Sequence, residues 1–223
     1  ADKQVVYFHL KKEDNPAMGY RAIRICLTRP EIFKTQLRAL YRASIYGNLG
    51  VMFPMITSVS ELEKILAICE EVKAELREQG VTYSDTMELG IMIETPAAAI
   101  ISDRLAPMVD FFSVGTNDLT QMTLGFSRDD IAKFLPIYLE KGILKNDPFQ
   151  ILDRNGVGQL IREAVFKGRG TRENLKCGIC GEHGGEPSSV EFCHFAGLNY
   201  VSCSPFRVPI ARLAAAHAAL KEA

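Results

Sequence analysis

The sequence lacks the features that mark several specialised classes of protein. It has no tryptophan, only four histidines, and a formal net charge of −1 over 223 residues. A charge so close to zero gives no electrostatic reason to expect a nucleic-acid or membrane partner. No apolar run reaches the roughly 18–20 residues that a membrane-spanning helix needs, and no signal peptide is recognisable. Apolar residues make up 47% and charged residues 24%, which is typical of a globular protein.

Disulfide stabilisation and classical nucleotide binding are also not indicated. Six cysteines in a chain of this length do not form a disulfide framework, and several lie within apolar segments, so we expect a reducing, cytoplasmic setting. Neither a Gly-x-Gly-x-x-Gly motif nor a P-loop follows a strand-like segment. The chain starts at Ala1 rather than at a methionine, and we expect it to be a fragment.

The chain alternates strand-like and helix-like segments. Strands are predicted at residues 21–25, 50–55, 88–93, 110–114, 176–180 and 199–203. Helices are predicted at about 30–44, 58–80, 96–106, 130–140, 157–167, 187–196 and 207–221. Six β-then-α units with apolar strands indicate a parallel sheet covered by helices, and we expect one domain over residues 1–223.

Polar residues follow several of these strands, most clearly in residues 110–121 (Asp-Phe-Phe-Ser-Val-Gly-Thr-Asn-Asp-Leu-Thr-Gln). A buried strand that ends in a polar turn before a helix can present N–H groups to an anion. An ordinary helix cap by Asn117 or Asp118 is the simpler alternative. In a (β/α) barrel such strand ends form one face and the site lies there, whereas a doubly wound sheet has its site at the switch point.

These residues make the chain recognisable. It resembles the phosphoenolpyruvate (PEP)-binding barrel of the PEP-utilising enzymes, a group that includes Enzyme I of the bacterial sugar phosphotransferase system, pyruvate phosphate dikinase and PEP synthase. The motifs that carry the resemblance are residues 15–24 (Asn-Pro-Ala-Met-Gly-Tyr-Arg-Ala-Ile-Arg), 52–55 (Met-Phe-Pro-Met), 90–96 (Gly-Ile-Met-Ile-Glu-Thr-Pro), 115–121 and 180–182 (Cys-Gly-Glu).

The two halves of the chain resemble different members of this group. Residues 1–121 look like Enzyme I, whereas residues 122–221 look like the dikinase, notably at 122–130 and 176–187. The resemblance implies a TIM-type (β/α)8 barrel. It also implies that the barrel is incomplete here, because its first two strands have no counterpart in the chain. The domain that carries the phosphorylated histidine in the family also has no counterpart.

By resemblance, Glu94 and Asp118 hold Mg²⁺, which bridges the phosphate and enolate oxygens of PEP. Magnesium prefers one or two carboxylates and leaves its other positions to substrate and water. Gly115, Thr116 and Asn117 would present N–H groups and an amide to the substrate. The alternatives are two helix N-terminal charges and a tight turn that merely requires glycine.

Arginines and one lysine complete the implied substrate site. Arg21 and Arg128 would pair with the phosphate, because a planar guanidinium matches phosphate oxygens. Arg21 starts a predicted strand, which is the wrong end for a barrel site, so Arg24 is the alternative at that motif. Lys3 matches a lysine that lies near the substrate in the family.

Cys180 is the implied acid–base group. Loss of the phosphoryl group leaves an enolate, and by resemblance the Cys180 thiol delivers a proton to its methylene carbon, a task that suits a pKa near neutrality. Cys177 and Cys180 also form a Cys-x-x-Cys, which leaves half a zinc site or a redox pair as alternatives. Glu182 and His183 follow the thiol and are candidates for tuning it.

These features lead to three hypotheses. In the first, the chain moves a phosphoryl group from PEP, with Mg²⁺, to a histidine on another domain and releases pyruvate, by the Enzyme I type of reaction or, as the alternative, the dikinase type. In the second, it is a non-catalytic fragment that dimerises, since the family barrel forms homodimers. The third is another Mg²⁺-dependent barrel that acts on an oxoacid through an enolate.

Overall fold

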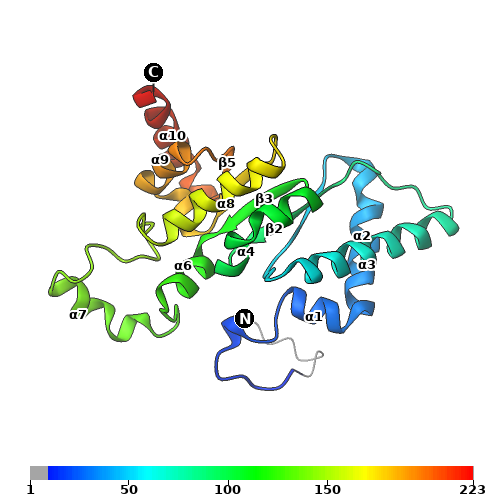
Figure 1. Ribbon diagram of the computed structural model, residues 1–223, viewed down its shortest axis with the longest axis horizontal. Coiled ribbons are helices and arrows are strands. Elements are labelled where there is room, and N and C mark those ends of the chain that lie inside the picture. Colours follow the sequence, from blue (N-terminus) through cyan, green and yellow to red (C-terminus); the bar gives the residue numbers. More distant parts are fainter. Residues whose placement is uncertain (1–9, 223) are drawn as a thin grey trace. The chain divides into compact units, whose positions relative to one another are not determined.

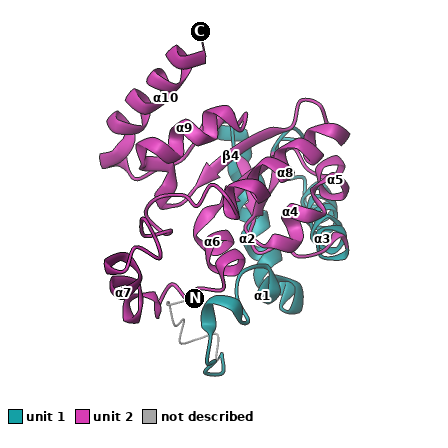
Figure 2. Cartoon of the chain, turned by 60° about the vertical axis from the view of Figure 1, so that its left-hand side comes forward, with its two compact units in different colours: residues 1–49, 60–87 teal, residues 50–59, 88–223 magenta. Residues whose placement is uncertain are grey.

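The computed structural model describes residues 10–222, and Lys3 lies outside them. The chain divides into two compact units (Figure 2). Unit 1 comprises residues 1–49 and 60–87, and unit 2 comprises residues 50–59 and 88–223. The expectation of one domain over residues 1–223 stays a prediction.

Unit 1 is helical. It contains α1 (Ile23–Thr28), α2 (Pro30–Ala43) and most of α3 (Val59–Glu78). Helix α2 begins at a proline, which favours the first helical position, and buries Phe33, Leu37 and Tyr41. Helix α3 buries one stripe with helical spacing, consisting of Leu62, Ile65, Cys69, Val72 and Leu76. The two long helices match the predicted segments 30–44 and 58–80 closely.

The strand predicted at residues 21–25 is wrong, because α1 occupies Ile23–Thr28. Alternating Ile23, Ile25 and Leu27 suggested a strand, yet only Ile23 of the helix is buried. Periodicity over so few residues cannot separate the two structures. The Arg24 guanidinium donates to the carbonyls of Met18 and Gly19 at 2.6 and 2.8 Å, which folds the preceding turn back onto the helix.

Unit 2 is built on a parallel five-stranded sheet (Figure 1). Its strands are β1 (Gly50–Phe53), β2 (Glu88–Ile93), β3 (Phe111–Gly115), β4 (Lys176–Cys180) and β5 (Tyr200–Val201). They pair in chain order, β1-β2-β3-β4-β5. This order contains no reversal, unlike the doubly wound alternative. Five of the six predicted strands are confirmed, which makes the α/β class certain.

One face of the sheet is covered by helices. Most of its side chains are aliphatic, and those that are buried are Phe53, Ile91, Ile93, Phe112, Val114, Cys177 and Ile179. Helix α8 (Val157–Thr171) packs closely here, because a Cβ on its Gly168 would lie 2.9 Å from the Phe112 ring. Helices α4 (Pro96–Ile100) and α5 (Ser102–Leu105) contact α8. The single helix predicted at 96–106 is therefore interrupted at Ile101.

The opposite face combines aromatic rings with glycines. Gly90 pairs with Phe111 in register, and a Cβ on Gly90 would lie 2.5 Å from the Phe111 ring. Gly178 pairs with Tyr200, and a Cβ there would lie 2.1 Å from that ring. Each ring thus lies across a glycine of the neighbouring strand, which explains glycine in a strand interior. The same face carries the functional candidates described below.

The remaining helices follow the strands of unit 2. They are α6 (Thr116–Leu124), α7 (Leu135–Glu140), α9 (Pro187–Phe195) and α10 (Val208–Glu222). The segment predicted as a helix at 130–140 is a 3-10 turn at Ile131–Lys133 followed by α7. That region forms a small hydrophobic cluster in which Ile131, Leu135 and Phe149 are buried and Phe126, Phe134 and Leu144 pack against them.

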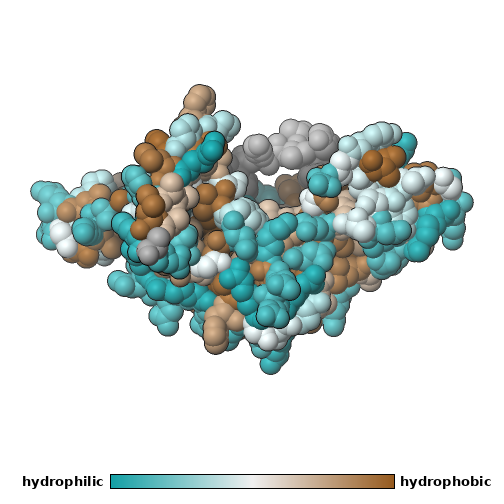
Figure 3. All heavy atoms as spheres, turned by 90° about the horizontal axis from the view of Figure 1, so that it is seen from above, coloured by the Kyte–Doolittle hydropathy of each residue, from teal (hydrophilic) through white to brown (hydrophobic). Residues whose placement is uncertain are grey.

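Within residues 10–222, no helix has the length and apolar character that crossing a membrane would require. Hydrophobic and hydrophilic residues are interspersed on the face seen in Figure 3. Several large hydrophobic side chains of the C-terminal region are exposed, among them Phe206 (94%), Leu213 (58%) and Leu220 (75%). They lie on and just before α10, whose inner side packs against α9 through Ala211 and Ala214.

Candidate active site

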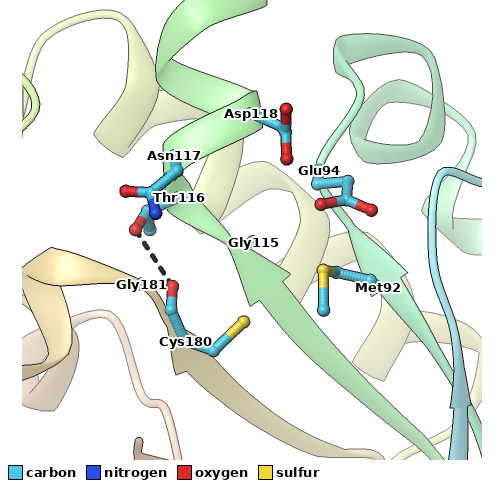
Figure 4. A pocket seen from close by; sticks show the side chains of 8 residues that line it. All are labelled: Met92, Glu94, Gly115, Thr116, Asn117, Asp118, Cys180 and Gly181. Atoms are coloured by element: carbon cyan, nitrogen blue, oxygen red, sulfur yellow. Dashed lines mark hydrogen bonds between the residues drawn. The ribbon is translucent and has the colours of Figure 1, made fainter. Parts of the chain in front are cut away.

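A pocket of about 140 Å³ lies at the carboxyl ends of β2, β3 and β4. At roughly 30 Å³ per water molecule, this is room for four or five waters or a small polar ligand. Figure 4 shows its lining, which comes from three separate segments of unit 2: Met92, Glu94, Gly115, Thr116, Asn117, Asp118, Cys180 and Gly181. Six of these residues are among the predicted site residues, and parallel pairing brings them to one edge of the sheet.

Glu94 follows β2 and is only 4% exposed. The next residue, Thr95, caps α4 by accepting a hydrogen bond from the Ala98 N–H at 3.1 Å, so the strand must turn at Glu94. One Glu94 oxygen accepts a hydrogen bond from the Met55 N–H at 2.6 Å. Met55 has φ +59°, a conformation costly for a non-glycine residue, and the carboxylate helps to hold it. Glu94 therefore fixes the turn after β1 as well as facing the pocket.

The turn after β3 is a helix start rather than a loop. Helix α6 begins at Thr116 with Gly115 as its cap residue and without a side-chain capping hydrogen bond. Asn117 and Asp118 are therefore the second and third residues of the helix rather than its cap residue. Asp118 lies in the first turn, and Figure 4 shows its carboxylate and that of Glu94 facing the same space.

Cys180 ends β4 and is half-buried, with its Sγ 3.5 Å from the Val114 carbonyl oxygen. Burial raises the pKa of its thiol, the Ser113 side chain lowers it, and the negative charges of Glu94 and Asp118 raise it further. The net direction is upward, so the thiol is protonated at neutral pH. This differs from the expected pKa near neutrality, chiefly because the thiol is buried and to a lesser extent because the two carboxylates lie close by.

Cys177 does not share a site with Cys180. Side chains three apart on a strand point to opposite faces, and Cys177 is fully buried on the helix-covered side. Burial raises the pKa of its thiol to about 11. Both cysteines are free. The strand geometry therefore argues against the redox pair and the half zinc site that the Cys-x-x-Cys left open.

Neither of the predicted arginines is among the residues that line the pocket. Arg128 follows α6 and is exposed, with its backbone N–H donated to the Gln121 side chain at 2.8 Å and its guanidinium 3.7 Å from the Glu182 carboxylate. Arg21 belongs to unit 1, where it donates to the Ala17 carbonyl at 2.8 Å. It precedes a helix, so the objection based on a strand no longer applies. The roles of Arg21, Arg128 and Lys3 stay predictions.

Two pocket residues were not predicted, Met92 and Gly181. Met92 lies two residues before Glu94 on the same face of β2, so strand alternation could have identified it. Gly181 has φ +108°, and a Cβ there would lie 2.6 Å from the Thr116 hydroxyl oxygen. Only glycine fits this position without strain. Glycine directly after a strand-ending cysteine was the available signal.

Replacing Gly115 by alanine tests how tightly the pocket is built. Its Cβ would lie 2.7 Å from a Glu94 carboxylate oxygen and 2.7 Å from the Met92 sulfur. We expect Gly115→Ala to lower the free energy of unfolding by about 1–3 kcal/mol, as overpacking does. Denaturant unfolding would measure this change.

Gly170→Ala is the matched control, because Gly170 lies in α8 with nothing within 4 Å of its added Cβ. There we expect no loss, or a gain of roughly 0.5–1 kcal/mol. Equal stabilities of the two variants would contradict a tightly packed pocket.

A buried histidine adjoins the pocket and makes stability depend on pH. Burial lowers the pKa of His183 below its ordinary value of 6.5. The hydrogen bond with the Pro148 carbonyl and the charges of Glu186, Glu182 and Asp147 raise the pKa, but burial has the larger effect. The unfolded chain therefore takes up a proton at a pH where the folded chain has not. We expect the free energy of unfolding to fall as pH drops below about 6.5.

Denaturant unfolding between pH 7.5 and pH 5 would measure this slope, and His183→Gln should flatten it. Carboxylates with a lowered pKa, such as Glu186 and Glu191, have ordinary values of 4.5 and act mostly below this window. An unchanged slope in the variant would show that another group is responsible.

Comparison with known proteins identifies the family of this chain. The family model for the PEP-utilising enzyme, PEP-binding domain, matches residues 1–220. A pyruvate, phosphate dikinase from Clostridium symbiosum is 55% identical over 217 residues, covering 93% of this chain and 25% of that protein. The dikinase from Rickettsia prowazekii is 49% identical over 222 residues (96% and 25%), and a chloroplastic one from Arabidopsis thaliana is 53% identical over 212 residues (92% and 22%).

Two further findings come from these comparisons. A citrate lyase structure from Burkholderia xenovorans LB400 superposes with a TM-score of 0.55 at 18% identity, over 81% of this chain and 53% of that one, a likeness of fold alone. The chain spans about a quarter of the length of the dikinases. Because those matches cover 92–96% of the chain, the dikinase likeness includes the half expected to resemble Enzyme I. The chain belongs to the PEP-binding domain family of the PEP-utilising enzymes.

Proposed function

We propose that this chain is the PEP/pyruvate domain of a phosphotransferase of the dikinase type. One observation carries the proposal: two carboxylates, a thiol and the start of α6 line one pocket at the carboxyl ends of parallel strands. The Enzyme I type of reaction remains the alternative. We further propose that the sheet is part of an incomplete (β/α)8 barrel formed by residues 1–223, which the sequential parallel strand order supports.

The pocket fits a magnesium ion by the chemistry of its donors. Glu94 and Asp118 offer hard carboxylate oxygens, and the absence of a Cβ on Gly115 leaves room for the Glu94 carboxylate beside it. Among residues 10–222, no three His, Cys, Asp or Glu side chains gather as a metal-binding group. Two protein ligands suit Mg²⁺, which takes its other ligands from substrate and water. When bound, Mg²⁺ would supply positive charge to the phosphate and enolate oxygens of PEP.

Cys180 acts at the carbon end of the substrate in this proposal. When the bond between phosphorus and the enol oxygen breaks, the electron pair stays on that oxygen and an enolate forms. The protonated thiol of Cys180 then gives its proton to the methylene carbon, which yields pyruvate and a thiolate. In the reverse direction the thiolate removes a methyl proton. The raised pKa of the thiol favours its protonated form, as the first direction requires.

The start of α6 and the arginines act at the anionic end. Gly115, Thr116 and Asn117 present backbone N–H groups at the N-terminus of a nine-residue helix, where an anion is favoured. Arg128 and Arg21 would pair with the phosphate, and Lys3 would lie near the substrate. The phosphoryl acceptor would be a histidine on a domain outside these residues, where a bond between phosphorus and nitrogen replaces the broken one.

A non-catalytic dimerisation fragment is the second candidate. The exposed Phe206, Leu213 and Leu220 around α10 favour a protein partner, such as a second copy of this chain. Sedimentation would then show a stable dimer that PEP does not affect. Catalysis and a homodimer are compatible, so the ligand response decides between the candidates. The cytoplasmic location also stays a proposal, since several relatives are described as chloroplastic.

Isothermal titration calorimetry of the chain with PEP, in the presence and absence of Mg²⁺, tests the proposed function. We expect binding with Mg²⁺ and a large loss of affinity when EDTA removes it. Oxaloacetate and other oxoacids serve as competitors, because the third hypothesis predicts that one of them binds more tightly than pyruvate. Absence of Mg²⁺-dependent PEP binding in folded protein would refute the proposal.

A further inference from the structure

His183 lies at the centre of a tightly packed segment that follows β4. It belongs to the 3-10 turn Glu182–Gly185 and has no exposed surface. A Cβ on Gly184 would lie 2.1 Å from the Ser202 carbonyl oxygen, and one on Gly185 would lie 2.4 Å from the Arg207 side chain. The glycines therefore let the backbone pack against the segment after β5, which directs the imidazole into the interior.

Both imidazole nitrogens have partners. Nε2 lies 2.9 Å from the Pro148 carbonyl oxygen and Nδ1 lies 2.7 Å from the Thr116 hydroxyl oxygen. A carbonyl can only accept, so Nε2 carries a proton. Burial keeps the ring neutral at pH 7, so Nδ1 is an acceptor and the Thr116 hydroxyl is its donor.

The Thr116 hydroxyl has a second acceptor within reach, the Cys180 carbonyl oxygen at 3.0 Å (Figure 4). The hydroxyl has one proton for these two acceptors. It belongs to the first residue of α6 and faces Cys180, the last residue of β4. Because the hydroxyl gives its proton to Nδ1, His183 sets the direction of the Thr116 side chain, which faces the last residue of β4.

The Nε2 side reaches another part of the site. Pro148 precedes Phe149, which packs in the hydrophobic cluster with Ile131 and Leu135. Phe126 packs against the same cluster, and Arg128 lies between it and Ile131 in the chain. The hydrogen bond from Nε2 to Pro148 thus anchors the segment that carries Arg128.

We propose that His183 is a positioning residue with two separable roles: Nδ1 orients the carbon end of the site through Thr116, and Nε2 anchors the phosphate end through Pro148. This inference rests on the proposed function, which assigns Cys180 to the carbon and Arg128 to the phosphate. It predicts that the two hydrogen bonds affect different steps, whereas a merely structural histidine would affect both alike.

The matched variants His183→Asn and His183→Gln separate the two hydrogen bonds. The asparagine amide reaches the place of Nδ1 and leaves Pro148 without a donor. The glutamine amide reaches the place of Nε2 and removes the Nδ1 acceptor, so that the Thr116 hydroxyl turns to the Cys180 carbonyl. In amide NMR spectra, we expect His183→Asn to shift residues 126–134 and 147–152. We expect His183→Gln to shift residues 116–118 and 180–181.

Activity should divide in the same way. Pyruvate has no phosphate, so its methyl-proton exchange reports the carbon end alone. We expect His183→Gln to slow this exchange by about 10-fold or more, with PEP affinity changed less than threefold, since small displacements of reacting groups are costly. We expect His183→Asn to weaken Mg²⁺-dependent PEP binding by about 10-fold and to leave exchange at saturating pyruvate within threefold.

Amide shifts at the same residues in both variants would overturn the inference. If the wild-type chain neither binds PEP nor exchanges pyruvate protons, the proposed function fails, while the amide pattern still decides whether the two hydrogen bonds act separately. Should a histidine variant fail to fold, Thr116→Val removes the hydroxyl alone and should reproduce the His183→Gln pattern. Shifts at residues 147–152 in Thr116→Val would likewise contradict separate roles.

Discussion

Replacing Cys180 by alanine is expected to slow the exchange of pyruvate methyl protons into deuterated water by about 100-fold or more, as loss of a general acid–base group does. The reason is geometric. The thiol faces the pocket that Glu94 and Asp118 also face, and it is the one sulfhydryl among the lining residues of that pocket. In the proposed mechanism, exchange requires the two carboxylates proposed to bind Mg²⁺ and the thiol, but no phosphorylated histidine. Proton NMR of pyruvate with Mg²⁺ would measure the rate.

Cys177→Ala is the matched control, since it removes the other thiol of the Cys-x-x-Cys from the same strand. Cys177 is fully buried on the opposite face and contacts the Leu175 carbonyl rather than the pocket. We expect Cys177→Ala to lose some stability and to keep exchange within threefold of wild type. Exchange in Cys180→Ala equal to that in the control would exclude the thiol as the acid–base group. No exchange in any folded form would favour the non-catalytic candidate.

Asp118→Asn is expected to reduce Mg²⁺-dependent PEP affinity by roughly 100-fold or more. Mutating a residue that only hydrogen-bonds to a metal ligand already lowers affinity by about 10–100-fold, so losing a ligand itself should cost at least as much. The change keeps the size and the helical position of the side chain and removes one of the two charges offered to the metal. Glu94→Gln should lower the affinity similarly. Its amide oxygen can still accept the hydrogen bond from the Met55 N–H, so we expect the turn after β1 to be kept. Calorimetry with PEP at fixed Mg²⁺ would measure both.

Asp110→Asn provides the control, because Asp110 precedes β3 whereas Asp118 lies in the helix that follows it. Asp110 precedes β3, accepts a hydrogen bond from the Leu89 N–H at 2.9 Å and pairs with Arg172 at 2.9 Å. That ion pair is partly exposed, so its loss should cost about 0–1 kcal/mol of stability. PEP affinity should remain unchanged in this variant. If Asp118→Asn also retains its affinity, the metal does not bind where we propose.

Local sequence patterns predicted most of the helices and strands. The reason for success or failure differs from segment to segment. Strands β2 and β4 match the prediction to the residue, because each is an apolar run followed by residues that must turn. Segment 21–25 failed because a six-residue helix with one buried side chain has no recognisable period. The long α3 was predicted correctly because its apolar stripe, from Leu62 to Leu76, extends over about four turns.

The pocket residues at strand ends were predictable for a related reason. Glu94, Gly115 and Cys180 each end or follow a strand, and parallel strands bring their carboxyl ends to one edge without further information. Their chemical roles stay predictions, as do those of Arg128 and Arg21. Met92 escaped notice because an apolar residue within a strand looks like core until the face it occupies is known.

By itself, the sequence determined the α/β class, the parallel strands and the groups that meet at their carboxyl ends, because these follow from short-range periodicity and turn residues. Only the tertiary structure decided which face of the sheet the helices cover, that Tyr200 lies over Gly178, and that Thr116 lies between His183 and Cys180. Such contacts join residues of neighbouring strands and turns that are distant in the sequence. Strand register and helix packing set them, and no local pattern records either.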